Sequence, residues 1–148
     1  MNLTIVSFTP TEIGLYSPFT VTTGVYVVKG DASSVEMVDR IAVLPGGFKH
    51  DPDGYHDTPV YPGRVWWDIL FQGATPYAHT QYYNLLDLVG RHGALRGLVR
   101  ASTDPYEFVA QAKLKSVKGE WSPPYRQATR NTLEVRVTFE LLNFWMAD

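Results

Sequence analysis

The stretch that decides the fold class is NTLEVRVTFELLNFW, residues 131–145. Its apolar and polar residues alternate, with Leu133, Val135, Val137, Phe139 and Leu141 set against Glu134, Arg136, Thr138 and Glu140. Successive side chains of a strand point to opposite faces of a sheet, so this pattern predicts a strand with one face in the core and one in water. Residues 106–117 repeat the pattern, with Phe108, Ala110, Ala112 and Leu114 set against Gln111, Lys113 and Lys115.

Further β-prone runs precede these two strands. Residues 3–8, 24–29, 35–44 and 94–100 each predict a strand, and Gly30-Asp31 predicts a turn after the second of them. Residues 64–72 carry apolar side chains at both alternating sets of positions, which predicts a strand covered on both faces. Residues 14–23 show no clear period, and we interpret them as an extended arm.

One helix is expected, beginning at Thr75-Pro76. Threonine is a favoured N-cap and proline a favoured first residue, and Gly90 and Gly93 offer a C-terminal stop. Spacings of three and four residues define one apolar stripe, made of Ala78, Tyr82, Leu85, Leu86 and Val89. The core is predicted to include Leu85, Leu86, Val89, Val135, Val137 and Phe139. The element order predicts a globular, mainly β protein with one α-helix.

Composition bounds the function. The 148 residues fit one domain, residues 1–148, and 45% apolar against 19% charged residues allow a substantial core. Few charges and many aromatics favour a surface hidden against partners. The net charge of −2 without a clustered basic run does not favour tight nucleic-acid binding. With no cysteine, no signal peptide and no apolar run long enough to span a membrane, we expect a protein made in a reducing cytoplasm, without membrane insertion.

Residues 45–63 form the most informative irregular stretch, with four Pro, four Gly, three Asp and two His. Loops of this length are unusual in compact domains and are often functional. We interpret it as an assembly loop. Its candidate interface residues are Asp51, Asp53, Tyr55, His56 and Tyr61.

Metal binding by this loop is the alternative. Asp51, Asp53 and Gly54 partly resemble a calcium loop, and His50 and His56 beside carboxylates suit a transition metal. The remaining spaced ligands of a calcium loop are missing, and Asp and Gly are ordinary loop residues. We favour the ordinary loop and predict no metal and no cofactor.

Catalytic signatures are also missing from the sequence. It has no G-x-S-x-G elbow and no glycine-rich phosphate loop, so we do not expect an enzyme. The aromatic residues Tyr55, Tyr61, Trp66 and Trp67 leave a second function open, a small β-sandwich module that binds carbohydrate or a host surface. Trp66 and Trp67 point to opposite faces of one strand, so at most one of them joins a sugar platform.

The second half of the chain resembles the tail-tube and distal-tail proteins of long-tailed bacteriophages. The resemblance rests on the strand Gly63–Ile69, the helix end at residues 85–95, the strands at 110–117 and 134–141, and the terminal Trp145. It covers about residues 63–145.

This resemblance implies a β-sandwich or split β-barrel flanked by a helix. It also implies a structural subunit of the virion tail, forming a homo-oligomeric ring, usually hexameric, around a channel. DNA passes through such a channel during genome ejection without specific binding, and other phage tail proteins are the further partners. A long loop that bridges neighbouring subunits is common in this family, and residues 45–63 stand where it is expected. Distal-tail proteins often carry a larger C-terminal region, so the tail position stays open between tube, distal ring and tail-tip ring.

Overall fold

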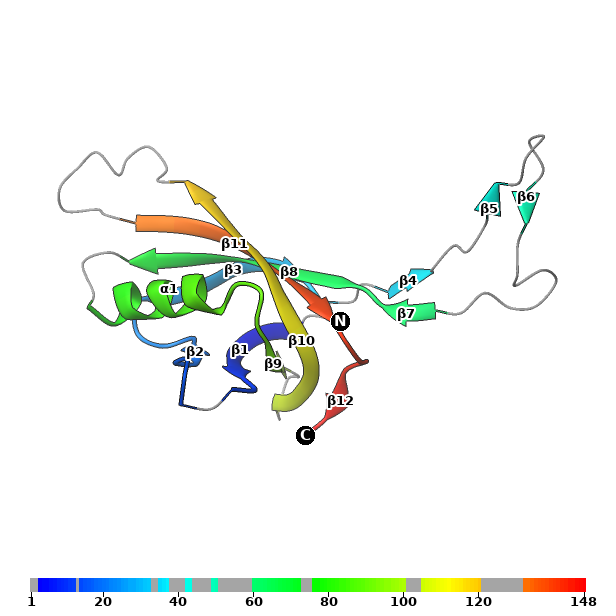
Figure 1. Cartoon of the computed structure of the whole chain (residues 1–148). Helices are drawn as coiled ribbons and strands as arrows, with labels where there is room; N and C mark the ends of the chain where they lie inside the picture. The colour runs from blue at the N-terminus through cyan, green and yellow to red at the C-terminus, as the bar shows by residue number, and fades with distance from the viewer. Residues whose placement is uncertain are drawn as a thin grey trace.

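In the computed structural model, most of the strands form a single antiparallel sheet that curves around a helix (Figure 1). The structure describes residues 3–12, 14–32, 35–37, 42–43, 49–50, 60–72, 76–100, 105–120 and 132–148. The elements in chain order are β1 (Leu3–Pro10), β2 (Phe19–Thr20), β3 (Val25–Asp31), β4 (Val35–Met37), β5 (Ala42–Val43), β6 (Lys49–His50), β7 (Val60–Pro62), β8 (Arg64–Gln72), α1 (Pro76–Leu88), β9 (His92–Arg100), β10 (Pro105–Glu120), β11 (Thr132–Leu141) and β12 (Met146–Ala147). The prediction of a mainly β fold with one helix is confirmed.

The main sheet has the strand order β2-β1-β9-β10-β11-β8-β3, and β12 pairs with β10 beside this path. Strand β10 is the longest and joins the two halves of the sheet. Its first part, from Pro105 to Lys113, pairs with β9, and its second part, from Ala112 to Glu120, pairs with β11. Strand β12 lies along the first part of β10, on the side opposite β9.

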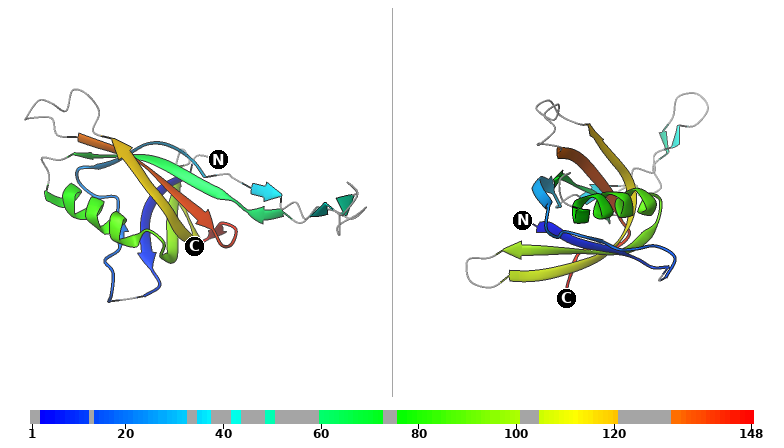
Figure 2. Two further views of the ribbon diagram at one scale, coloured as in Figure 1. Left: turned by 45° about the horizontal axis from the view of Figure 1, so that its top comes forward. Right: turned by 90° about the vertical axis from the view of Figure 1, so that its left-hand side faces the viewer.

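The sheet is open but strongly curved, so that β1, near one end of the order, comes close to β3 at the other end (Figure 2). Three of its strand pairs shift register, after Ile5 in β1, after Val27 in β3 and after Leu114 in β10. Such bulges increase local twist and bend the strand that carries them. The curvature makes one face of the sheet concave, and the hydrophobic core lies on this concave face.

Alternate residues of the strands fill this concave side. Phe139 of β11 is fully buried, with its ring centroid 5.1 Å from that of Phe8 and 6.0 Å from that of Trp67. Val135 and Val137 are buried beside it, as the alternation in β11 predicts. Each buried aliphatic or aromatic side chain contributes roughly 1.5–3 kcal/mol by leaving water.

The helix packs on the concave side through Ala78, Leu85 and Leu88, all fully buried, while the Tyr82 ring lies 5.4 Å from that of Phe71 in β8. The predicted apolar stripe was therefore wrong at Leu86 and Val89. Leu86 is 39% exposed and Val89 is 41% exposed. Leu86 lies about 100° around the helix from Leu85, and the helix ends at Leu88, before Gly90 adopts a φ of 85°. Leu88 fills the last core position instead.

Three local predictions need correction. Residues 14–23 are not a free arm, because Phe19 pairs with Phe8 in the sheet and is fully buried. Gly30 and Asp31 do not form a turn but continue β3, opposite Trp67 and Trp66. The strand predicted at 131–145 ends at Leu141, and the chain bends before β12.

The segment predicted as one strand at 35–44 contains two short strands, β4 and β5, and residues 38–41 and 44 lie outside the described part. The predicted assembly loop, residues 45–63, contains β6 and β7.

Candidate functional site

Strands β4 to β7 form an arm that projects from the curved sheet. Strand β4 pairs with β7 and β5 pairs with β6, in two small antiparallel sheets separate from the main one. Figure 1 shows both pairs beyond the ends of β3 and β8, away from the body. We use "the arm" for residues 33–62, of which the structure describes 35–37, 42–43, 49–50 and 60–62.

Of the candidate interface residues, only Tyr61 lies in the described part of the arm, in β7 opposite Glu36 of β4. Asp51, Asp53, Tyr55 and His56 lie outside the described residues.

Both roots of the arm are held by the C-terminal segment. The Trp145 indole Nε1 donates a hydrogen bond of 3.1 Å to the carbonyl oxygen of Ala32. The backbone N–H of Leu141 donates one of 3.0 Å to the carbonyl oxygen of Gly63. Ala32 and Gly63 are both buried, so the arm leaves the body from two anchored points.

An exposed apolar stripe lies in the same C-terminal segment. Leu142 is 52% exposed, Phe144 is 51% exposed and Met146 is 56% exposed. The residues between them face the body, because Asn143 Oδ1 accepts a hydrogen bond of 2.8 Å from the Gln111 N–H and Trp145 reaches Ala32. The alternation that buries Phe139 and Leu141 thus continues through the bend, but the outward positions now carry apolar side chains, so three of these face solvent beside the arm roots. Sequence inspection missed this stripe by extending β11 through it.

A charged cluster occupies the outer face of β3, β8 and β11. Arg136 donates to both carboxylate oxygens of Asp68, from Nε at 2.8 Å and from Nη2 at 3.1 Å, and Lys29 Nζ lies 3.7 Å from Oδ2. Asp68 is only 6% exposed, and the hydrogen bond from Arg136 holds the pKa of its carboxyl below the usual value, against the opposing effect of burial. The Arg136 guanidinium also lies 3.9 Å from the centroid of the Trp66 ring.

This stacking bears on the sugar-platform alternative. One face of Trp66 is covered by Arg136, and Trp67 is 1% exposed in the core. Neither indole therefore offers both faces to a ligand. The side chains of Tyr55 and Tyr61 lie outside the described part of the chain.

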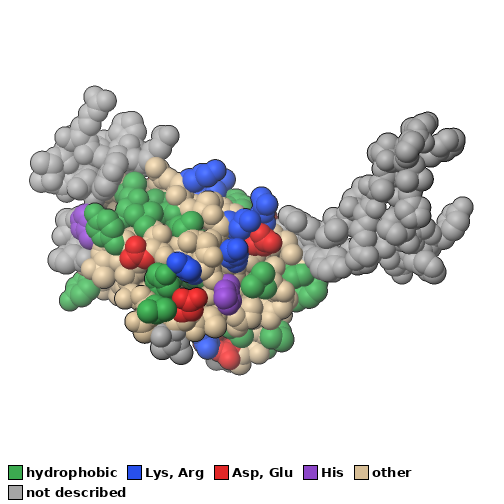
Figure 3. All heavy atoms as spheres, in the orientation of Figure 1, with side chains coloured by type: hydrophobic (Ala, Val, Ile, Leu, Met, Phe, Trp, Pro, Cys, Tyr) green, Lys and Arg blue, Asp and Glu red, His purple; other side chains and the backbone are tan. Residues whose placement is uncertain are grey.

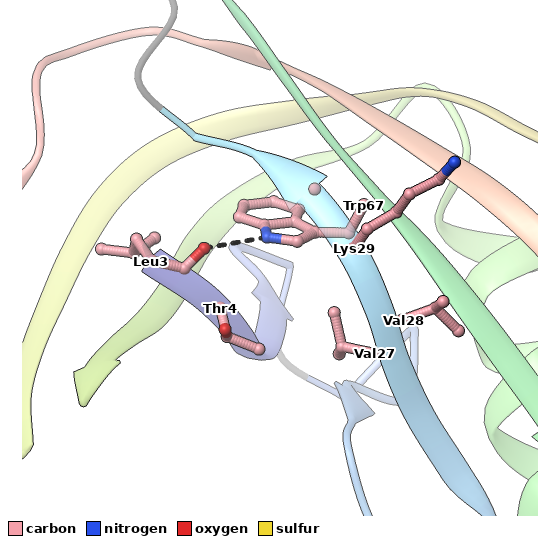
Figure 4. A pocket seen from close by; sticks show the side chains of 7 residues that line it. Leu3, Thr4, Val27, Val28, Lys29 and Trp67 are labelled. Carbon is pink, nitrogen blue, oxygen red and sulfur yellow. Dashed lines mark hydrogen bonds between the residues drawn. The ribbon is translucent and has the colours of Figure 1, made fainter. Parts of the chain in front are cut away.

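A cleft of about 320 Å³ separates β1 from β3 (Figure 4). Leu3 and Thr4 line one side, residues 27–30 line the other, and the Trp67 indole lies across the gap. Its Nε1 donates a hydrogen bond of 3.0 Å to the carbonyl oxygen of Leu3. Among the described lining residues Lys29 is the one titratable group, so this part of the cleft supplies no acid–base pair.

Among the described residues, no group of three or more His, Asp or Glu side chains is placed to share a metal ion. Most residues of the alternative metal-binding site, from Asp51 to Asp57, lie outside the described part of the chain. In the residues that the structure places, helix α1 is too short to cross a bilayer.

The candidate site is therefore the arm together with the apolar stripe at its roots. Comparisons with known proteins add no assignment: no family model matches the chain, and neither a curated protein nor a solved structure matches it.

Proposed function

We propose that the chain is a structural subunit of a phage tail that assembles, in tube or distal-tail position, into a ring around the DNA channel. Rings of the family that the sequence resembles are usually hexameric. In this proposal the work is done by contacts between subunits, with no catalytic step.

The observation that carries the proposal is the arm with its two anchored roots. A segment that projects from the body contributes few contacts to the core of its own subunit, yet Ala32 and Gly63 are buried and hydrogen-bonded. Anchored roots fix the direction in which the arm leaves the body. A fixed direction lowers the entropy lost when the arm binds a neighbour.

The apolar stripe supports the same function. Leu142, Phe144 and Met146 are large apolar side chains, each about half exposed and alternating along one short segment. Phe and Met are enriched at interface cores, and the segment that carries the stripe also holds the arm roots.

The sheet edges give further support. Within the described residues, β3 is the edge strand at one end of the main sheet. At the other end, the short strand β2 pairs only with Ser7 and Phe8 of β1. Unpaired edges invite pairing with other chains, and a ring is one arrangement that covers them.

The test replaces residues 33–62 with a short Gly-Ser linker between Ala32 and Gly63. Asp31 and Trp66 are register partners, so a short connection can join the two roots. Gly63 must stay, because its carbonyl oxygen accepts the Leu141 N–H bond. We expect a melting temperature close to wild type and loss of rings, measured by mass photometry and negative-stain microscopy of concentrated protein.

Two results would contradict the proposal. A wild-type chain that stays monomeric at every concentration would refute ring assembly, and glycan binding by that monomer would favour the carbohydrate-binding alternative. Normal rings from the arm-deleted chain would exclude the arm as the assembly element.

A further inference from the structure

We propose that the acidic arm of one subunit docks on a basic outer face of the neighbouring subunit. This inference rests on the proposed ring assembly and identifies the surface that receives the arm. The strand register of β10, β11, β8 and β3 and the charges along the chain support it.

Three consecutive cross-strand rows hold the cationic part of this outer face, which we call the basic face, and the next row, with Glu120 opposite Glu134, lies outside it. Residues directly opposite one another in an antiparallel pair share one side of the sheet. The first row is Lys118, Arg136, Asp68 and Lys29, the second is Ser116, Thr138, Trp66 and Asp31, and the third is Lys113, Glu140 and Arg64. Lys115, beside the bulge in β10, joins the third row through its 3.0 Å ion pair with Glu140.

The basic face carries six cationic and three acidic side chains, a formal net charge of +3. Two of its three acidic groups are already engaged with cations of the face: Asp68 binds Arg136 and Lys29, and Glu140 binds Lys115. Among the described side chains, no carboxylate lies within ion-pair distance of Lys113, Lys118 or Arg64. Figure 3 shows Lys and Arg side chains gathered on the face where β10 crosses β11.

The arm carries the opposite charge. Residues 33–62 contain five acidic and two basic residues, a formal net charge of −3. Three of the acidic residues, Asp51, Asp53 and Asp57, fall within a run of seven residues that has no Lys or Arg. The rest of the chain, with ten acidic and eleven basic residues, has a net charge of +1, so the charge of the protein is divided between arm and body.

Geometry favours a neighbour as the acceptor. Figure 1 shows β4 to β7 directed away from the body that carries β10 and β11. The acidic residues 51–57 lie in the sequence between β6 and β7, so an arm whose described strands leave the body in this direction can reach the equivalent face of a second copy. Complementary potentials of this kind set the register of an interface and suppress wrong partners.

The first experiment compares single charge reversals at exposed positions of the full chain. Lys113→Glu lies on the basic face, and the control, Arg91→Glu, lies outside it, where Arg91 stacks on Tyr16 at 4.7 Å. We expect Lys113→Glu to raise the concentration for half-assembly about tenfold or more, and Arg91→Glu to leave it within about twofold. Circular dichroism and melting curves check that each variant folds.

The second experiment restores the attraction with reversed signs. Lys113→Glu/Lys118→Glu and Asp51→Lys/Asp53→Lys should each abolish assembly, because each places like charges opposite one another. The chain with all four changes should assemble again. Wild-type assembly should also weaken as salt rises from about 0.05 to 0.5 M, since screening shortens the reach of exposed charges.

The outcomes separate this inference from the proposed function. If wild type forms rings and the basic-face variants form them equally well, the arm does not dock there, although ring assembly stands. If the four-change chain fails to assemble while both double variants fold, charge pairing between arm and face is refuted. If the basic-face variants lose only binding to duplex DNA, the face is a nucleic-acid surface and the inference is wrong. A wild-type chain that never assembles removes both proposals.

Discussion

The indole N–H of Trp67 in β8 is bonded to the carbonyl oxygen of Leu3 in β1 at 3.0 Å, across the gap where the curved sheet fails to close. Strand β3 ends the strand order beyond β8 and faces β1 across this gap, and the missing side chain of Gly30 leaves room for the indole. A Cβ at Gly30 would clash with Cδ1 of Trp67 and with the carbonyl oxygen of Trp66. The Trp67–Leu3 hydrogen bond therefore links β8 to β1 across the open side of the sheet. The indole fits there because Gly30 has no side chain.

Trp67→Phe should destabilise the protein by about 1–3 kcal/mol, because Leu3 loses the donor to its carbonyl oxygen. Urea unfolding measures the loss, and faster hydrogen exchange at residues 3–5 locates it. Trp66→Phe is the control, since Trp66 lies on the outer face and a Phe there keeps part of the stacking with Arg136, so the loss should stay below about 1 kcal/mol. Equal losses for the two variants would contradict a bridging role for Trp67.

Phe139→Ala should cost about 3–5 kcal/mol, the usual range for a phenylalanine removed from a packed core. Phe139 is fully buried between the rings of Phe8 and Trp67. The matched control is Phe144→Ala, at a position 51% exposed, where the same truncation should change the stability of the monomer by less than about 1 kcal/mol. Denaturant unfolding of both variants at a concentration below assembly makes the comparison, and a Phe139 loss below about 1 kcal/mol would contradict the observed register.

Asp68→Asn should lower stability at neutral pH and matter less in acid. The hydrogen bond from Arg136 lowers the pKa of Asp68 below its usual value of 3.8. A carboxyl with a lowered pKa in the folded state contributes stability above its unfolded pKa, and that contribution is lost as pH falls through the folded pKa. The free-energy difference between wild type and variant should therefore be largest near pH 7 and shrink below about pH 4.

Glu140→Gln is the control for this pH dependence. Glu140 pairs with Lys115 at 3.0 Å, but both side chains are more than a third exposed, and exposed pairs contribute little. Its hydrogen bond to Lys115 also lowers its pKa, so the difference should have the same sign and a smaller size. A pH-independent difference for Asp68→Asn would refute the role of this ion pair.

Metal removal should leave folding unchanged. The motive is the incomplete ligand pattern between His50 and Asp57 in the sequence. Melting curves with chelator, with added calcium and with added zinc should coincide. A rise of many degrees with either ion would reveal a native-state site, because a ligand that binds only the folded state stabilises it.

Much of the fold was predictable because it depends on local alternation. Strands β10 and β11 followed from the period of two, which any strand with one wet face must show. The helix followed from its Thr-Pro start and its apolar spacing, yet the assignment of Leu86 and Val89 to the core was wrong. Val89 is exposed because the helix ends at Leu88 and Val89 lies in the turn that follows. Leu86 is exposed because it lies to one side of the face that meets the sheet, and residue spacing alone does not tell which side that is.

The predicted site was only partly placed. Sequence inspection chose the irregular segment 45–63 from its length and composition, and β6 and β7 fall within it. It could not show that Trp145 and Leu141 hold the arm roots, because Trp145 and Ala32 are 113 residues apart in the chain. It also extended β11 through Leu142 and Phe144, since a bend at these residues leaves the alternation itself unbroken.

The sequence by itself determined the strand faces, the single helix, the core alternation and the opposite charges of arm and body. Only the tertiary structure decided that Lys118, Arg136, Asp68 and Lys29 form one row, because that row depends on which strands pair and in what register. The same holds for Trp67 and Leu3, which meet only because the sheet curves. The side-chain period is a property of each strand alone, whereas neighbour order, register and curvature arise from the packing of the whole chain around one core.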